Sequence, residues 1–308
     1  MAKVAVIGSG PAGCTASLYL ARAGVEVDFY VGDKGGQLMS TTSIENFPSY
    51  PDISGADLMG KMLSHALSYP LVKERVGTVC AVFEGKTLPT KVSSVVAGGA
   101  LEMNEYNAVI VASGSSPKKL DAELTDSVGG IGISYCSVCD AQFSRGKPVV
   151  VVGGGNSAMT DAIYLSRFAS KVTLVVRGLR LKGEKVLIDK VNKDIEVIYN
   201  HQVKKLEGDK VTGLTGVVIS NKDGEERVLP AFSLFVAIGH KPNTDFLPEA
   251  DRPSGDVFGS RGNTTTLQRV FVAGDVSGRN YRQAIVSAGD GCKAALDVVS
   301  ELTKSGEL

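Results

Sequence analysis

Two cysteines and an aspartate form the group of residues best suited to chemistry. Cys136 and Cys139 make a CxxC pair, and Asp140 follows at once. Sulfurs three residues apart can approach each other on one helical turn, so the pair can cycle between dithiol and disulfide. Asp140 could donate or accept the proton that this cycle exchanges. The structural alternative for Asp140 is a charge at a helix N-terminus.

Metal binding is the other chemistry that a CxxC can serve. Structural zinc needs four ligands, but the chain has no second CxxC and its three histidines are isolated from one another. We therefore expect a redox pair and no metal. The other cysteines are Cys14, Cys80 and Cys292, which leaves an odd total of five. We expect these three to be small buried hydrophobic residues rather than reactive thiols.

A glycine-rich turn near the N-terminus could hold a dinucleotide. An apolar strand runs into a full GxGxxG and then into a helix-periodic stretch; the turn consists of Gly8, Ser9, Gly10, Pro11, Ala12 and Gly13. Its three glycines permit a tight turn, a close approach of the backbone to a pyrophosphate, and close packing of helix on strand. The helix N-terminus offers N–H donors to the phosphates. Asp33 is a candidate for the acid that binds a ribose, although it lies past the second strand.

A second copy of this unit begins 145 residues later. At this offset, residues 149–169 repeat Val4, Val6, Gly8, Gly10, Tyr19, Leu20 and Arg22. Gly13 is matched by Ala158, so the second turn reads GxGxxA from Gly153 to Ala158. The strand that follows ends at Arg177 instead of an acid, with Arg180, Lys182 and Lys185 just beyond. An arginine at this place favours a 2′-phosphate, and so NADPH over NADH. The alternative is a solvated basic face.

The elements that must position these groups indicate two similar domains. Each copy has a strand, a turn, a helix and a second strand, and further apolar strands are expected at 106–112, 235–238 and 270–272. Helices are expected at 58–67 and 284–302. The predicted fold class is α/β, with two Rossmann-like dinucleotide-binding domains that have parallel sheets in three layers and are joined by two linker strands.

Composition excludes several classes of protein. The chain has 308 residues, of which 43% are hydrophobic and 21% charged, as expected for about two folded domains. Lys and Arg total 33 and so do Asp and Glu, which argues against binding to nucleic acid or a membrane surface. No apolar run reaches the ~18–20 residues that span a bilayer. The N-terminus does not read as a signal peptide, so we expect a cytoplasmic protein.

Taken in order, these motifs resemble those of the low-molecular-weight, bacterial-type thioredoxin reductases. These are FAD- and NADPH-dependent flavoproteins among the class II pyridine nucleotide-disulfide oxidoreductases. The resemblance covers essentially the whole chain. The matching segments are SYCSVCDAQF, GGQL (35–38), ENFP (45–48), GGGNSA, AIGHKPNT (237–244), VFVAGDV (270–276) and YRQA (281–284).

The resemblance implies two binding sites in two domains. FAD is implied in a discontinuous domain of residues 1–113 and 244–308, and NADPH in a domain of residues 114–243 that carries the CxxC. Besides the first turn, the implied FAD residues are Gly36, Gln37, Leu38, Asn46, Gly274, Asp275, Arg282, Gln283 and Ala284. The implied NADPH residues are Gly153, Gly155, Asn156, Ser157, Ala158, Arg177, Lys182, Ile238 and Gly239.

The resemblance also implies a reaction, which is the reduction of thioredoxin or a thioredoxin-like protein by a homodimeric enzyme. Electrons pass from NADPH through FAD to the disulfide. Cys139 is then the flavin-proximal sulfur, Cys136 attacks the partner disulfide, and Asp140 is the proton donor. Rotation of one domain on linkers near 113–117 and 239–244 would let one flavin meet both the NADPH and the CxxC.

Three positions depart from the family pattern. Family members usually carry paired arginines after the second strand and a third arginine a few residues on, where this chain has Gly178 after Arg177, and then Lys182. Ala141 stands where glycine is usual after the aspartate. These departures leave alternatives open: a reductase that uses NADH or ferredoxin, or a dithiol oxidase that passes electrons to oxygen. A non-enzymatic flavin-binding redox sensor is a further alternative.

Overall fold

The chain folds into two units. The computed structural model describes residues 1–32, 34–41, 44, 46–83, 90–96, 100–247, 267–278 and 281–308. Unit 1 consists of Met1–Ser116 and Pro242–Leu308, and unit 2 of Pro117–Lys241. These boundaries lie two or three residues from those expected at 113/114 and 243/244. The binding roles expected for the two domains stay predictions.

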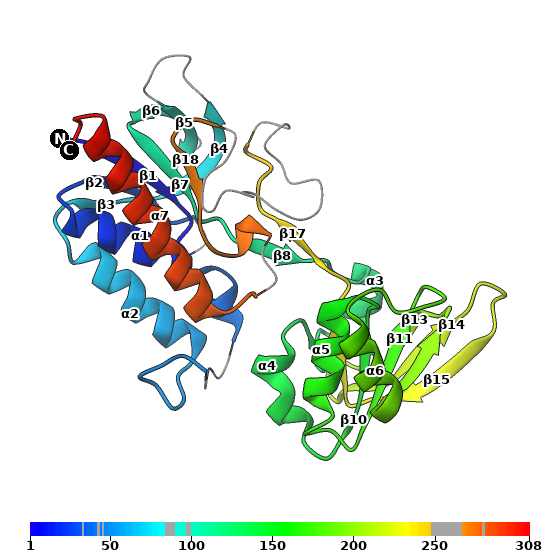
Figure 1. Ribbon diagram of the computed structural model, residues 1–308. Helices are drawn as coiled ribbons and strands as arrows, with labels where there is room; N and C mark the ends of the chain where they lie inside the picture. The colour runs from blue at the N-terminus through cyan, green and yellow to red at the C-terminus, as the bar shows by residue number, and fades with distance from the viewer. Residues whose placement is uncertain are drawn as a thin grey trace. The chain divides into compact units, whose positions relative to one another are not determined.

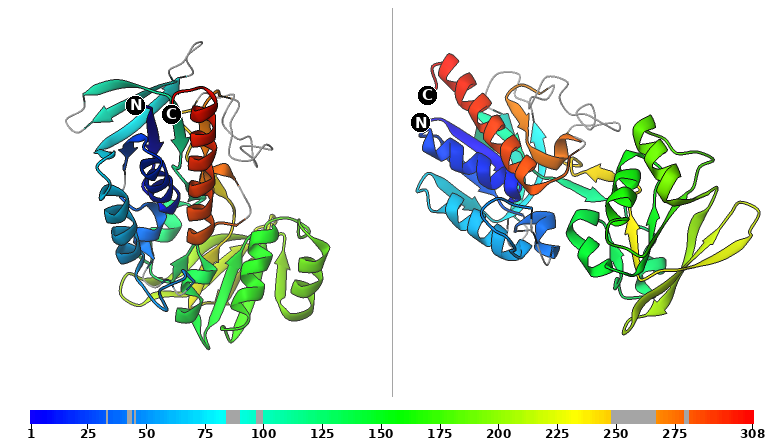
Figure 2. Two further views of the ribbon diagram at one scale, coloured as in Figure 1. Left: turned by 60° about the vertical axis from the view of Figure 1, so that its left-hand side comes forward. Right: turned by 60° about the horizontal axis from the view of Figure 1, so that its bottom comes forward.

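Unit 1 is built on a five-stranded parallel sheet of order β18-β7-β1-β2-β3. Its strands are β1 (Lys3–Ile7), β2 (Glu26–Tyr30), β3 (Val72–Arg75), β7 (Ala108–Val111) and β18 (Val270–Val272). The centre of the sheet is almost entirely apolar because both of its faces are covered. Figures 1 and 2 show helices α1 (Pro11–Arg22), α2 (Gly55–Leu67) and α7 (Ala284–Lys304) together on one face.

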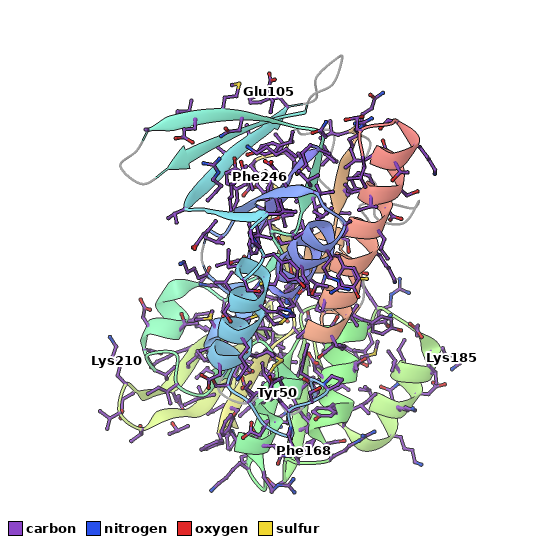
Figure 3. The ribbon with its side chains drawn as sticks, turned by 90° about the vertical axis from the view of Figure 1, so that its left-hand side faces the viewer. Tyr50, Glu105, Phe168, Lys185, Lys210 and Phe246 are labelled. Atoms are coloured by element: carbon purple, nitrogen blue, oxygen red, sulfur yellow. A yellow bond between two sulfur atoms is a disulfide. The ribbon has the colours of Figure 1, made fainter. Side chains whose placement is uncertain are left out.

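The other face of this sheet is covered by strands. An antiparallel sheet of β4 (Gly77–Phe83), β5 (Thr90–Val96) and β6 (Leu101–Tyr106) packs there through Val79, Val82 and Tyr106. Phe246 packs against the same cluster, and its backbone oxygen accepts a hydrogen bond from Val82 at 3.1 Å (Figure 3). Two 3₁₀ helices complete the unit: η1 (Gly36–Ser40) packs against α2, and η4 (Gly274–Ser277) packs against α7.

Unit 2 repeats this plan. Its parallel sheet has the order β12-β11-β10-β16-β9, with β9 (Ile133–Ser134), β10 (Pro148–Val152), β11 (Lys171–Val176), β12 (Glu196–Tyr199) and β16 (Ser233–Val236). One face carries α5 (Asn156–Leu165) and α6 (Lys185–Asp194). The other face carries antiparallel β13 (Gln202–Asp209), β14 (Gly213–Ser220) and β15 (Glu226–Pro230). Short helices α3 (Ala122–Asp126), α4 (Ser137–Asp140) and η2 (Ala141–Ser144) complete the unit.

The two parallel sheets share one topology, so the predicted fold of two Rossmann-like units is confirmed. The starts of β1 and β10, of α1 and α5, and of β2 and β11 each lie 145 residues apart. The strand before the glycine turn is central in both sheets: β1 lies between β7 and β2, and β10 lies between β16 and β11. The strand order reverses at this point, which is the switch point at which α/β sheets bind ligands. In each unit an antiparallel sheet, instead of helices, forms the third layer.

The two crossings between the units run as paired strands, β8 (Ser115–Pro117) and β17 (His240–Pro242). Asn243 ties their unit 1 ends together. Its backbone N–H donates to Gly114 O at 3.0 Å and its side-chain amide to Ser113 O at 2.9 Å. The Ser116 hydroxyl donates to Oδ1 of Asn243 at 2.9 Å. Asn243 therefore holds the start of the first predicted linker segment against the end of the second.

Candidate active site

The first glycine turn is shaped by contacts between backbone atoms. Gly8 has a φ of +107°, and a Cβ there would lie 2.4 Å from the carbonyl oxygen of Ala112. A Cβ on Gly13 would lie 1.8 Å from the carbonyl oxygen of Gly8. In contrast, nothing lies within 4 Å of the Cβ position of Gly10, the residue that precedes α1. The turn is closed on its protein side and open where a ligand would approach.

Ser9 joins this turn to the segment that precedes η1. The buried Ser9 hydroxyl donates to Val31 O at 2.7 Å and accepts from Gly35 N at 3.0 Å. A Cβ on the next residue, Gly36, would lie 3.9 Å from the Cα of Gly10. Gln37 donates from its side chain to the Ser115 backbone oxygen. Residues 36–38 therefore lie beside the open side of the turn.

The C-terminal segment of unit 1 reaches the same turn. A Cβ on Gly274 would lie 3.0 Å from the Cβ of Ala12. Burial raises the pKa of Asp275 above its ordinary value, and the Ser287 hydroxyl, which donates to it at 3.0 Å, opposes this shift in part. Asn46 donates to the side-chain oxygen of Gln283 at 3.1 Å. The three stretches predicted to contact FAD thus come together in unit 1.

The residues of this site suit a dinucleotide. α1 begins with Pro11, has no side-chain cap and has no acid in its first turn, so its N-terminal N–H groups face an open space. The Arg282 Nε is buried and has no hydrogen-bond partner among the described residues. A buried donor of this kind is costly unless a ligand satisfies it. Ala284 begins α7, and Leu38 packs at the edge of the core. Asp33 and Glu45 lie outside the described residues.

The second turn in unit 2 has equivalent contacts. Gly153 has a φ of +149°, and a Cβ on it would lie 2.3 Å from the carbonyl oxygen of Ala237 and 2.8 Å from the Cβ of Ala158. Gly155 precedes α5, and the nearest atom to its Cβ position is 3.9 Å away. Ile238 and Gly239 follow Ala237 directly in the chain. Ser157 is exposed in the first turn of α5.

A cationic loop is fastened to the second turn. Lys182 N donates to Gly154 O at 2.7 Å, and Glu184 N donates to the side-chain oxygen of Asn156 at 2.9 Å. The side chains of Arg177, Arg180 and Lys182 are exposed, and none makes an ion pair with a described residue. Three unpaired cations beside a helix N-terminus suit a highly charged anion.

The two predicted redox cysteines are joined as a disulfide, with their Cα atoms 5.3 Å apart. Cys136 caps α4, because its sulfur accepts a hydrogen bond from Cys139 N at 3.2 Å. Both cysteine residues are partly exposed. The Asp140 carboxylate accepts from the Ser134 hydroxyl at 2.7 Å, and that hydroxyl accepts from Cys136 N at 3.1 Å. Asp140 is thus held on the same turn as the disulfide.

The expectation for the other cysteines was partly wrong. Cys14 is buried, and burial raises the pKa of its thiol to about 12, which makes it inert. Cys292 is partly buried. Cys80 is exposed, because the β4–β5 pairing shifts register between Val79 and Ala81 and leaves Cys80 as the extra residue. Within the described residues no three His, Cys, Asp or Glu side chains gather as a metal site.

One contact near the disulfide has no signal in the sequence. Ser137, between the two cysteines, is buried and donates its hydroxyl to Asp161 in the middle of α5. The two residues are 24 positions apart, so the contact depends on how α4 packs on α5. Ser134, which holds Asp140, was also not singled out from the sequence.

Comparison with known proteins places these features in context. The family model described as pyridine nucleotide-disulphide oxidoreductase matches residues 2–291. A thioredoxin reductase of Buchnera aphidicola is 39% identical over 313 residues, covering 96% of this chain and 95% of that protein. One from Streptomyces clavuligerus is 40% identical over 306 residues, covering 96% and 92%.

Solved structures agree with these relatives. A thioredoxin reductase from Giardia duodenalis superposes with a TM-score of 0.84 at 34% identity, covering 98% of this chain and 99% of that one. One from Streptococcus pyogenes has a TM-score of 0.81 at 32% identity, with the same coverage. None of the helices in the described part of the chain is long and apolar enough to cross a bilayer.

Proposed function

Because this chain belongs to the pyridine nucleotide-disulphide oxidoreductase family, we propose that it is a thioredoxin-disulfide reductase. NADPH is the electron donor, FAD the bound flavin, and thioredoxin or a thioredoxin-like protein the acceptor. The observation that carries this proposal is the Cys136–Cys139 disulfide in a unit that also holds a GxGxxA turn. The other unit supplies a complete GxGxxG turn for the second dinucleotide.

The two glycine turns would bind two different dinucleotides. The open N-terminus of α1 would hold the FAD pyrophosphate, Asp275 would bind the ribityl chain, and Arg282 and Gln283 would bind near the ring system. The second turn receives the NADPH pyrophosphate at the N-terminus of α5. Bound FAD supplies the transfer of an electron pair from nicotinamide to disulfide, and the protein orients it and excludes water.

The disulfide chemistry belongs to Cys136, Cys139 and Asp140. Reduction takes up two electrons and two protons and leaves two thiols. The Cys136 thiolate then attacks one sulfur of the partner's disulfide and forms a mixed disulfide. Cys139 attacks Cys136 in turn, releases the partner as a dithiol, and restores the original disulfide. Asp140, held by Ser134, moves the proton that these exchanges require.

The preference for NADPH rests on Arg177 and Arg180. The family's second arginine is absent at Gly178, but a Cβ there would lie 3.7 Å from the carbonyl oxygen of Arg180 and 4.0 Å from its nitrogen. The Arg180 backbone therefore lies next to the place where a side chain of residue 178 would begin, and we assign the second charge for the 2′-phosphate to Arg180. Lys182 adds a third charge, as a point charge rather than a planar fork.

We further propose a cytoplasmic homodimer. Tyr19 on α1 and Ile285 and Leu296 on α7 expose 39%, 45% and 54% of their surface on neighbouring helices, and we assign this face to the contact with the second copy. Sedimentation equilibrium tests this: a mass of one chain would contradict it. The balanced net charge supports neither a nucleic-acid nor a membrane partner.

The test of function is a visible spectrum followed by kinetics. Purified protein should show a flavin spectrum that bleaches rapidly with NADPH and more slowly with NADH. With thioredoxin added, NADPH should be consumed steadily. A colourless protein that cannot be reconstituted with FAD would overturn the proposal.

Of the family's three usual arginine positions, only Arg177 carries an arginine here. This departure favours one second candidate, a related flavin enzyme with another electron donor or acceptor. It predicts a flavin that neither NADPH nor NADH bleaches, or bleaching that is followed by oxygen consumption without thioredoxin reduction. Reduction by ferredoxin would then identify the donor.

A further inference from the structure

Ser137 links the redox turn to the nucleotide-binding helix. It is the first residue between the two cysteines, its side chain is 3% exposed, and its hydroxyl donates to Oδ1 of Asp161. Asp161 lies on α5, the helix that begins at the second glycine turn. Through this hydrogen bond, a residue from another helix holds the segment that carries the disulfide.

Asp161 is a half-buried carboxyl that no cation neutralises. Burial raises its pKa above the ordinary aspartate value, and the hydrogen bond from Ser137 opposes that shift in part. No ion pair joins Asp161 to any described residue. The charged groups on α4, α6, β11 and the segment after η2 are Asp140, Lys185, Asp189, Lys190, Lys193, Asp194, Lys171, Arg145 and Lys147.

The cations among these groups are engaged elsewhere or make no ion pair. Lys185 extends from α6 (Figure 3) and pairs with Asp189 at 3.0 Å. Lys171 pairs with Glu196 at 2.7 Å, and Arg145 bonds to Gln142. Among these contacts, only the Ser137 hydroxyl compensates the negative charge of Asp161, and this hydroxyl belongs to a residue that lies between the two cysteines.

The two serine–carboxylate contacts at this turn differ in what they fix. Ser134 holds Asp140 within the local segment, since the two residues are six positions apart. Ser137 holds Asp161 across 24 positions and so fixes α4 against α5. Only the second contact can set where the turn sits relative to the helix that begins at the nucleotide turn.

We propose that Asp161 is a positioning residue for the redox pair, which anchors α4 through Ser137 and places a negative charge that disfavours thiolate formation at Cys136 and Cys139. The proposal rests on the proposed function only in taking these two cysteines as the reactive pair. A negative charge near a thiol opposes its ionisation, because thiolate and carboxylate repel each other. Fewer thiolates at a given pH mean slower exchange with disulfides.

The thiols themselves supply the test. Full-length protein is reduced with dithiothreitol, which converts the disulfide to two thiols and becomes a cyclic disulfide. After the reductant is removed, alkylation by iodoacetamide is followed from pH 5 to 10 at Cys136 and Cys139 by peptide mass spectrometry. In Asp161→Asn, the pH midpoint of the more reactive thiol should fall by at least about 0.3 unit, because Asn accepts the Ser137 hydrogen bond without the charge.

Matched variants separate charge from structure. Asp161→Glu keeps the charge and should stay near the wild-type midpoint. Thr160→Ala alters an exposed neighbour on α5 and should change nothing. If Asp161→Asn does not fold, Asp161→Gln takes its place, because it also removes the charge and can accept the Ser137 hydrogen bond, and its thiol midpoint should also fall. A folded Asp161→Asn or Asp161→Gln protein within about 0.1 unit of wild type would overturn the proposal.

This measurement needs neither nucleotide nor thioredoxin. A wild-type protein that failed to reduce thioredoxin would therefore overturn the proposed function and leave the alkylation result intact. Normal thioredoxin reduction with an unchanged midpoint would overturn only the role of Asp161.

Discussion

The tightest constraint on a single residue falls on Gly13. A Cβ there would lie 1.8 Å from the Gly8 carbonyl oxygen, and neither backbone segment can retreat without reshaping the turn. The sequence predicted this glycine from its motif, because the reason is local. The sequence could not predict that the Asp275 carboxyl is buried. Nor could it predict that the Arg282 Nε is buried without a hydrogen-bond partner among the described residues. Both properties depend on how the C-terminal segment packs.

Gly13→Ala should therefore remove the flavin and destabilise unit 1. Forcing a methyl group against backbone costs about 1–3 kcal/mol or more. The measurement is flavin content after purification, together with urea unfolding. Gly60→Ala is the control: Gly60 lies within α2 with nothing near its Cβ position, so alanine there should be neutral or stabilising by roughly 0.5–1 kcal/mol. Equal flavin content in both variants would contradict the role of the turn.

Arg177→Ala and Arg180→Ala should each weaken NADP⁺ binding roughly tenfold, since each removes a charged hydrogen-bond donor to the 2′-phosphate. NAD⁺ binding should change little. Calorimetric titration with both nucleotides measures this without turnover. Lys222→Ala removes an exposed charge from the turn between β14 and β15 of the same unit and serves as the control. Parallel losses for NADP⁺ and NAD⁺ would count against the 2′-phosphate assignment.

Asp28 makes the stability of the folded protein depend on pH. Burial would raise the pKa of this carboxyl, but hydrogen bonds from Lys3, Arg75 and Tyr106 outweigh burial and hold the pKa below its usual value. A lowered folded-state pKa stabilises the protein above the unfolded value of about 3.9, and this stability is lost as pH falls through the folded-state pKa.

Asp28→Asn should therefore destabilise the protein by on the order of 3 kcal/mol at neutral pH, because it leaves two cations beside a neutral group. The gap to wild type should stay constant from about pH 5 to 8 and narrow below about pH 4. Thermal unfolding of both proteins across this range measures it. A gap that widened in acid would refute the account.

At the scale of elements, the strands and helices followed their hydrophobic patterns closely. Strand β18 was predicted at 270–272 and α7 from 284, as found. The strand expected at 106–112 is broken at Asn107, because its side chain accepts from Lys3 N and its own N–H donates to Lys3 O, each at 2.8 Å. The contact of Ser137 with Asp161 escaped prediction for a related reason: periodicity assigns faces to helices but does not pair one helix with another.

The two crossings between the units are predicted to act as a hinge. Gly114 has a φ of +71° and open space at its Cβ position, so alanine there meets no clash but strains the backbone. If the crossings act as a hinge, Gly114→Ala should slow turnover severalfold while flavin stays bound. Gly306→Ala has the same φ within a degree and the same open space, far from the crossings in sequence, so its local strain is matched. Equal turnover in the two variants would reject the hinge.

For the whole molecule, the resemblance carried the prediction further than any motif alone. A glycine turn or a CxxC by itself is a weak signal, but two turns in a 145-residue repeat with a CxxC before the second specify an order of domains. The family membership and topology agree with that order. The ligand sites within it remain predictions, since they rest on geometry and resemblance together.

The division of the reaction between two units can be tested with cysteine variants. Cys136→Ser and Cys139→Ser should each abolish thioredoxin reduction, because both sulfurs are needed to form and resolve the mixed disulfide. Flavin reduction by NADPH should continue, since neither glycine turn is altered. Stopped-flow absorbance measures the first half of the reaction and steady-state kinetics the whole. Loss of flavin reduction in either variant would contradict this division.

Unit 2 is an insertion within unit 1, and this fixes the order in which the two can be completed during synthesis. All of Pro117–Lys241 precedes β18 and α7, which unit 1 needs for its sheet and its helical face. During synthesis, unit 2 can therefore fold completely while unit 1 still lacks strand β18 and helix α7, the longest helix of the described chain. A chain stalled near residue 265 would carry a finished unit 2 and a unit 1 that lacks strand β18 and the part of its helical layer that α7 supplies. The apolar surface left exposed there would be a binding site for chaperones.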